Sequence, residues 1–441
     1  MAQAKVIAPE ENSASASAEQ AGASRPPAPI VVRGEDGRAL PSVEDKLTLE
    51  DCIDIALANS PSAVAAALSA QEAQIAVRQA QNVLLPTVTA SANQGYTNHK
   101  TDGSPRTDHG STDSSVDATL TISGITDIAR TIKVQKMALE QAELNLEDVK
   151  NTIVKNVKRD YYALLSAKRA VAIRTKSRDL YQDQYDRAKA FFDNGLRPKV
   201  DVTTAEVNLN NEELSLIRAK NLVSSTSAQL ANTLGVATPK ILDLDDNVEE
   251  AAFEITFDEA VRTAYANRPD VRSADTDLQI NRIKLNQAKA GYWPTFSFSA
   301  GFSKSGDEFY LDNEDTKLLA SVQIPIFSAF KTYNDVKKAQ ISLEHTRNNN
   351  RSLLNNVFLE VQSAFIKMNE ASESIPIAKL NVQKASENLD LARGRYNEGI
   401  GDIIEMKDAE ISYTDAELSY LTARYDYATA VAELKQAMGM R

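Results

Sequence analysis

The stretch LTLEDCIDIALANSPS, residues 47–62, recurs 208 positions later as ITFDEAVRTAYANRPD, residues 255–270. The same shift matches Pro86 with Pro294, each followed by threonine and an alternating segment. Proline restricts both its own backbone and that of the residue before it, so matched prolines indicate matched chain geometry. The sequence therefore predicts one structural unit that occurs twice.

The repeat divides the chain into four predicted parts. Residues 1–46 are rich in Ala, Ser, Glu and Pro and lack aromatic residues, which predicts a disordered segment. This segment lacks the basic and apolar regions of a signal peptide, and Ala2-Gln3-Ala4 after Met1 would also fit a mature start with a replacement methionine. The first repeat covers 47–235, an acidic linker covers 236–254, and the second repeat covers 255–441.

Composition excludes several classes of function. The formal net charge of −12 over 441 residues disfavours a nucleic-acid partner. The single cysteine, Cys52, excludes an internal disulfide and is expected to be a small core residue of an amphipathic helix. The sequence contains no nucleotide-phosphate loop, nucleophile elbow or metalloprotease motif. We therefore expect no catalytic residue, no cofactor and no metal site, and the chain is not expected to be an enzyme.

Helices are predicted to dominate each repeat. A helix of nearly forty residues is expected to run from an N-cap threonine, Thr48 or Thr256, to the matched proline. Much longer helices follow the alternating segments, and each ends at a glycine, Gly195 or Gly399, before a final helix of nearly forty residues. Apolar residues recur at near-heptad spacing, which predicts long helical hairpins packed side by side. The two longest helices are expected over about 128–193 and about 330–397.

Four segments of about ten residues alternate between apolar and small polar side chains. In the third, Phe296, Phe298 and Phe302 oppose Ser297 and Ser299. A half-buried strand of a soluble protein has the same period. The strand length and the hydroxyl-rich faces favour transmembrane strands around a watery lumen. Four strands cannot close such a barrel, so several copies must contribute; three would supply twelve strands, although this argument does not fix the number.

Two further stretches carry a family resemblance, FFDNGLRPKVDVTTAE at 191–206 and RYNEGIGDIIEMKDAE at 395–410. Together with the duplicated openings, the two PT strand entries and IPIF before the second long helix, they resemble the TolC-type outer membrane factor family. The resemblance covers about residues 47–440. It implies a mainly α fold with a small β part: a trimer whose twelve-stranded transmembrane β-barrel continues into a periplasmic α-barrel of helical hairpins.

The resemblance also implies a function and partners. Members are passive exit ducts of tripartite efflux pumps or type I secretion systems, in the outer membrane of a Gram-negative cell and extending into the periplasm. The expected partners are two further copies (a homotrimer), a periplasmic adaptor (membrane fusion) protein, an inner membrane transporter and outer membrane lipid. The alternative, a periplasmic coiled-coil scaffold or adaptor-like hairpin protein, accounts for the helices but not for four matched strands.

Site residues follow from the resemblance, position by position. The position two after the second tip glycine often carries an arginine that pairs with an acid across the hairpin. Here that position is glycine, which leaves Arg197 or Arg395 as substitutes. The acids behind the second tip would form rings at a constriction and favour cations, although acids also simply favour a helix start. The implied adaptor-docking turns are Gly195, Leu196, Arg197 and Gly399, Ile400, Gly401; the constriction acids are Glu405 and Asp408; and the residues that hold the entrance shut are Tyr396 and Asp201.

Overall fold

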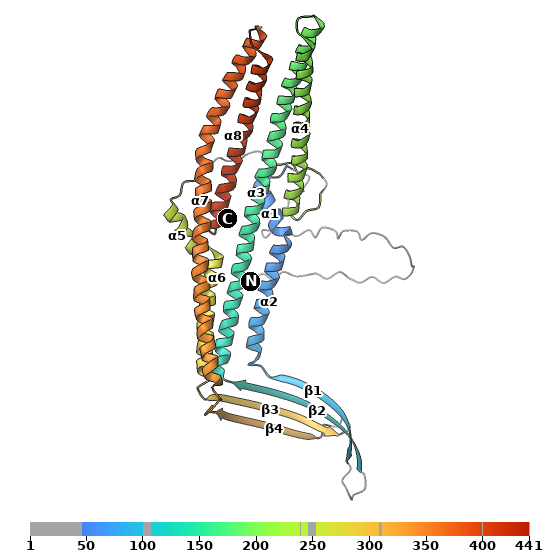
Figure 1. The fold of residues 1–441 in the computed structure, drawn as a ribbon. Coiled ribbons are helices and arrows are strands. Elements are labelled where there is room, and N and C mark those ends of the chain that lie inside the picture. The colour runs from blue at the N-terminus through green and yellow to red at the C-terminus, as the bar shows by residue number, and fades with distance from the viewer. Residues whose placement is uncertain are drawn as a thin grey trace, which may run out of the picture. The chain divides into compact units, whose positions relative to one another are not determined.

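The computed structural model describes residues 46–99, 107–238, 240–245, 253–307, 311–398 and 400–440. Residues 1–45 of the predicted disordered segment, much of the predicted linker and the tip residue Gly399 lie outside the described residues. Each half of the chain has the order helix, helix, strand, strand, long helix, helix (Figure 1). The order is the same in both halves, and each half has one helix boundary more than the sequence predicted.

The elements have the following bounds. The first half comprises α1 (Leu49–Asn59), α2 (Pro61–Asn82), β1 (Thr87–His99), β2 (Thr107–Ser123), α3 (Ile125–Asp193) and α4 (Lys199–Thr233). The second half comprises α5 (Phe257–Asn267), α6 (Pro269–Ala290), β3 (Thr295–Asp307), β4 (Asn313–Gln323), α7 (Lys331–Asn397) and α8 (Ile403–Ala437).

The first helix of each half is broken, and the prediction of one helix of nearly forty residues was wrong. Ser60 and Arg268 adopt extended backbone with ψ of 119° and 125°. Each precedes a proline, which disfavours helical geometry at the residue before it, so the chain bends and a new helix starts at Pro61 or Pro269. The predicted N-caps are confirmed, because Thr48 and Thr256 each form a capping box with an acid three residues on.

Among the described residues, no single helix has the length and hydropathy of a membrane span. The joined pair α1 and α2, bent by 51°, meets that criterion by length and composition.

The four strands form one antiparallel sheet in the order β1-β2-β3-β4. The sheet lies at one end of the long helices, and the turns between α3 and α4 and between α7 and α8 lie at the other end (Figure 1). The predicted alternation is confirmed by hydroxyl pairs that cross from strand to strand, Thr87 with Thr119 and Ser91 with Ser115. The apolar positions of the same strands remain exposed, with Phe296 66% and Leu318 74% accessible.

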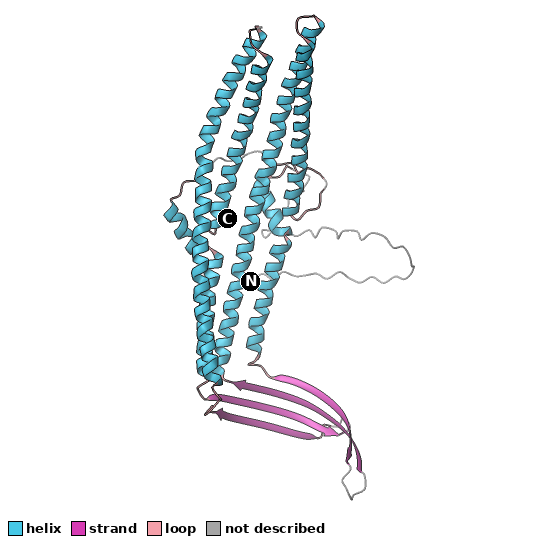
Figure 2. Ribbon diagram, viewed as in Figure 1, coloured by secondary structure: helices cyan, strands magenta, loops and turns pink. Residues whose placement is uncertain are grey.

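The helices pack as two long hairpins, α3 with α4 and α7 with α8, and α3 also packs along α8 (Figure 2). Two separate apolar cores lie where the short helices meet the hairpins. Val157, Leu164 and Leu234 belong to the first core, and Val361 and Met438 belong to the second. Cys52 is fully buried in the first core, as the sequence predicted. A third, smaller cluster of Leu389, Ala392 and Ala409 holds α7 and α8 together close to their turn.

Candidate functional site

The turn between α3 and α4 is closed by a left-handed glycine. Gly195 has φ of 72°, which confirms the conformation predicted for it, and its amide donates to the Phe192 carbonyl at 2.8 Å. The Leu196 amide donates to the Phe191 carbonyl at 2.8 Å, so the turn has both hydrogen bonds of a Schellman motif. The motif leaves the Leu196 side chain 68% exposed.

The turn between α7 and α8 repeats part of this geometry. The amides of Ile400 and Gly401 both donate to the Arg395 carbonyl, at 3.1 and 2.9 Å. Ile400 is 73% exposed and corresponds in position to Leu196. A Cβ atom at Gly401 would lie 2.9 Å from the Tyr396 backbone nitrogen. The turn therefore has no room for a larger residue at 401 without movement of the backbone.

An arginine on the opposite helix still pairs with one of the predicted constriction acids. Arg395 Nε lies 3.4 Å from Glu405 Oε1, and both side chains are about half exposed. Of the two substitutes expected from the sequence, it is Arg395 that bridges this hairpin. Asp408 lies one turn further along α8, exposed, and pairs with no basic side chain in the part of the chain that the structure describes.

Tyr396 lies near the end of α7, close to charged residues of the first hairpin. Its ring is 8% exposed, and its burial raises the pKa of the hydroxyl. Arg197 and Asp201 of the first hairpin both act on it electrostatically, so the structure brings these three predicted residues into one neighbourhood. Asp201 is half-buried in the first turn of α4, where its charge suits the helix N-terminus.

Behind the tips lies a buried carboxyl group, which the sequence did not reveal as a site. Glu410 of α8 is 3% exposed and accepts a hydrogen bond from the Gln184 amide of α3. Arg393 of α7 lies 3.8 Å from its other oxygen. Burial raises the pKa of Glu410 to about 7. The feature of the sequence that could have indicated this site is an acid four residues after Met406, within a stripe of apolar positions.

Further polar contacts join the same helices. Arg174 of α3 pairs with the buried Glu212 of α4 at 3.4 Å. The hydroxyl of Thr414 on α8 donates to that of Ser177 on α3 at 3.5 Å, with both residues buried. The Arg174–Glu212 pair lies within the first hairpin, whereas Ser177 with Thr414 and Gln184 with Glu410 give the contact between the two hairpins a polar character toward the tips.

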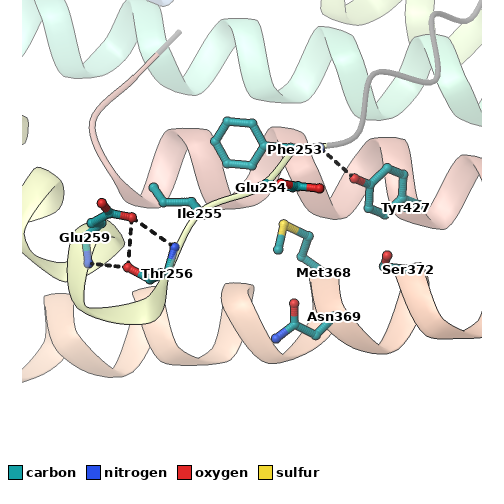
Figure 3. A pocket seen from close by; sticks show the side chains of 9 residues that line it. All are labelled: Phe253, Glu254, Ile255, Thr256, Glu259, Met368, Asn369, Ser372 and Tyr427. Atoms are coloured by element: carbon teal, nitrogen blue, oxygen red, sulfur yellow. Dashed lines mark hydrogen bonds between the residues drawn. The ribbon is translucent and has the colours of Figure 1, made fainter.

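A pocket of about 410 Å³ lies in the second half, between the segment before α5 and helices α7 and α8 (Figure 3). The Phe253 amide donates to the Tyr427 hydroxyl at 3.0 Å, and the capping box of Thr256 and Glu259 forms one wall. Three of its polar residues, Thr256, Glu259 and Tyr427, thus already serve to cap α5 or to hold the preceding segment. The pocket contains none of the predicted site residues.

Known proteins resemble the chain in sequence and in fold. Outer membrane protein TolC of Escherichia coli (strain K12) is 21% identical over 350 residues, which cover 76% of this chain and 70% of TolC. A solved structure of CusC superposes with a TM-score of 0.78 at 17% identity, and covers 95% of this chain and 99% of that one. The open MtrE outer membrane channel of Neisseria gonorrhoeae gives a TM-score of 0.76 at 18% identity over 89% of each chain. These likenesses show that the fold is that of TolC-like channels.

The family model for outer membrane efflux proteins matches residues 52–236 and 260–440, one segment in each repeat. Together the matched segments include most of both cores and every predicted site residue. The family is one of transport channels rather than of enzymes. The chain belongs to the outer membrane efflux protein family, and it is an outer membrane exit duct of an efflux system.

Proposed function

We propose that three copies of the chain form a passive duct, with a twelve-stranded barrel in the outer membrane and a barrel of helical hairpins in the periplasm. The observation that carries this proposal is the four-stranded sheet with two free edges. β1 and β4 each have one neighbour, and the apolar face beside them is exposed, including Val88 and Val322. Unpaired strand edges are not tolerated in lipid, so β4 of one copy must pair with β1 of the next.

Exposed apolar residues on the long helices support the same ring. On α4, Val200, Val207 and Leu214 recur at intervals of seven, and each is about half exposed or more. On α7, the exposed apolar residues Leu359 and Ile366 are separated by the same interval. Heptad stripes are buried by another helix in stable coiled coils. Packing of α4 from one copy against α7 from the next would bury both sets of residues.

The tips are proposed as docking sites for a periplasmic adaptor protein, which receives cargo from an inner membrane transporter. Leu196 and Ile400 support this role, because both turns present a large exposed apolar side chain on a fixed backbone. Rigid apolar side chains at the end of a hairpin suit a partner that caps the tip. The remaining proposed docking residues are Gly195, Arg197, Gly399 and Gly401.

The entrance is proposed to lie just behind these tips. Glu405 and Asp408 would form rings of acids from three copies, and rings of carboxylates favour cations. Tyr396 and Asp201 would hold the entrance narrow by keeping the two hairpin ends together. The adaptor would open the duct by binding the separated tips more tightly than the joined ones.

Charge removal tests the entrance. The double variant Glu405→Gln with Asp408→Asn should reduce cation selectivity in planar bilayers, because six carboxylates would leave the proposed ring. A matched control is Glu206→Gln with Glu213→Gln, which removes the same charge from exposed positions on α4. Equal selectivity in all three proteins would show that Glu405 and Asp408 do not line a constriction.

Native mass tests the assembly. In mild detergent, the protein extracted from outer membranes should have the mass of three chains. A single chain that stays in solution without detergent would contradict the shared barrel and would favour a soluble hairpin scaffold.

A further inference from the structure

The two repeats connect strand to long helix in different ways. In the first, Gly124 alone separates Ser123 at the end of β2 from Ile125 at the start of α3. In the second, residues 324–330 separate β4 from α7. The second connection is therefore longer by six residues, IPIFSA. These added residues are mostly apolar, which is unusual for a surface loop.

The longer connection ends in a turn that its residues do not favour. The Lys331 amide donates to the Ser328 carbonyl at 2.9 Å, and the two residues between them, Ala329 and Phe330, have φ of 47° and 64°. Both φ values are positive as in a type I′ turn, where Asn-Gly is preferred. Phe330 is the N-cap of α7, and the matching N-cap of α3 is Gly124 with φ of 62°. The second repeat thus places phenylalanine in a conformation for which the first uses glycine.

Contacts within the chain do not account for this choice. Phe330 is 70% exposed and touches Phe327 edge to face, at 6.1 Å between ring centroids. Phe327 and Ile326 are themselves 78% and 95% exposed. A side chain that costs backbone strain but packs against little within its own chain gains its stabilisation from a partner outside that chain.

The exposed residues of the connection form one patch with the entry to β3. A Cβ atom at Gly291 would lie 3.1 Å from the Thr332 side chain, which places the residues after α6 beside the start of α7. The next residues, Tyr292 and Trp293, are also exposed. We name these six side chains the junction patch: Tyr292, Trp293, Ile324, Ile326, Phe327 and Phe330.

Two features identify the partner as a lipid surface. Ile324 and Ile326 continue the even-numbered alternation of Leu318 and Val322, so they extend the apolar face of the sheet. The nearby helix ends carry exposed basic residues, which attract anionic headgroups. Between 282 and 290 and between 331 and 340 the single acid is Asp335, and the basic residues are Arg282, Lys284, Lys289, Lys331, Lys337 and Lys338.

We propose that the junction patch is an interfacial anchor that embeds in the headgroup–acyl boundary of the leaflet on the helical side of the membrane. This inference rests on the proposed duct, because it assumes that the sheet spans the bilayer. Tryptophan and tyrosine favour that boundary, where an apolar ring and a polar group can both be satisfied. The added loop gives the second repeat an anchor that the single-residue connection of the first cannot provide.

The only tryptophan of the chain, Trp293, lies in the patch and reports on it directly. The full chain would be reconstituted into phosphatidylcholine–phosphatidylglycerol vesicles brominated either near the headgroup or deep in the acyl chain. Two further proteins would carry the single tryptophan elsewhere, Phe330→Trp and Phe302→Trp, each in a Trp293→Phe background. Phe302 lies within β3 on the apolar face, so it reports on the spanning sheet.

We expect the tryptophans at 293 and 330 to lose more fluorescence to shallow bromines than to deep ones, and the tryptophan at 302 to show the reverse. Quenching at 302 without quenching at 293 and 330 would mean that protein covers the patch, and the anchor would be refuted while the duct stands. Absence of quenching at all three positions would refute the spanning sheet and the proposed function with it.

Discussion

The two repeats share one backbone feature at the end of their last helix, a glycine in the left-handed conformation. Gly235 and Gly439 follow α4 and α8 with φ of 70° and 74°. A Cβ atom at Gly235 would lie 2.9 Å from the Asn59 carbonyl, and one at Gly439 would lie 2.8 Å from the Arg268 backbone nitrogen. Each helix end is therefore seated against the break between the two short helices of its own half, where no side chain fits.

The side chains around this glycine differ between the two repeats. At the first break the Ser60 hydroxyl makes a hydrogen bond with the Ser62 hydroxyl. Arg268 at the second break is 8% exposed and donates to Asp270 and Glu360, each at 2.7 Å, and to the carbonyl of Ala437 at the end of α8. A cation at this position also complements the negative end of the helix.

The acidic residues behind the tips also differ between the repeats, and again the second repeat has the buried and paired charges. Glu206 and Glu410 occupy matched positions, yet Glu206 is exposed whereas Glu410 is buried. Across the second turn Arg395 pairs with Glu405, while the matched residues in the first half are Phe191 and Asp201. The repeats have retained the positions that backbone geometry dictates. At these matched positions the second half has a buried acid and an ion pair where the first half has neither, so the second tip should be the more sensitive to pH and to charge.

The largest expected effect comes from replacing the left-handed glycine that both repeats have at the end of their last helix. Gly439→Ala would add left-handed strain, about 1–2 kcal/mol, and a backbone clash, about 1–3 kcal/mol. The free energy of unfolding should therefore fall by roughly 2–5 kcal/mol, measured as a lower midpoint of guanidinium unfolding in detergent. Gly235→Ala should have an effect of similar size, because its contact with Asn59 is equally close.

The control for this prediction is Gly195→Ala. Gly195 has the same left-handed backbone, but nothing lies within 4 Å of the position that a Cβ atom would take. Only the left-handed strain of about 1–2 kcal/mol should remain. Equal losses of stability in Gly195→Ala and Gly439→Ala would show that close packing against the break is not the reason for glycine at position 439.

A smaller effect depends on pH and distinguishes Glu410 from Glu206, its matched residue in the first repeat. The pKa of Glu410, about 7, lies above the ordinary 4.5, so the folded chain holds a proton that the unfolded chain releases. The free energy of unfolding should therefore fall as pH rises from about 4.5 to about 7, by at most roughly 3 kcal/mol. Protonated Glu410 can also donate to Gln184 Oε1, which is buried and has no other hydrogen-bond partner among the described residues.

Glu410→Gln should remove this dependence, because an amide stays neutral and can make the same hydrogen bonds with Gln184. Unfolding midpoints from about pH 5 to about pH 8 should converge for the two proteins at acid pH and favour the variant at alkaline pH. Glu206→Gln, the matched change in the first repeat, removes one carboxylate from an exposed position and is the control for the loss of a charge. A steeper slope in Glu410→Gln than in the native chain would contradict the assignment.

The sequence was sufficient for the parts of the fold that depend on local pattern. Alternation predicted the four strands, and glycine with flanking helix predicted the turn at Gly195. The breaks at Ser60 and Arg268 were missed although Pro61 and Pro269 had been matched, because the apolar period continues through them. Burial of Glu410 and the choice of Arg395 over Arg197 as the partner of Glu405 could not be predicted, since both depend on the rotation of one long helix against another.

The smallest expected effect on stability, and the sharpest test of the second tip, comes from Arg395→Gln. The ion pair with Glu405 is about half exposed, so its loss should cost no more than about 1 kcal/mol. Its effect on conduction should be larger in proportion, because Arg395 neutralises an acid that we place in the entrance. Cation selectivity in planar bilayers should therefore rise in Arg395→Gln, opposite to its fall in Glu405→Gln with Asp408→Asn. Phe191→Gln, the matched change across the first turn, alters no charge and should leave selectivity as it is. If Arg395→Gln lowered selectivity, then Glu405 would be held in place by its partner rather than neutralised by it, and Asp408, which has no ion-pair partner within the described chain, would be the acid that selects.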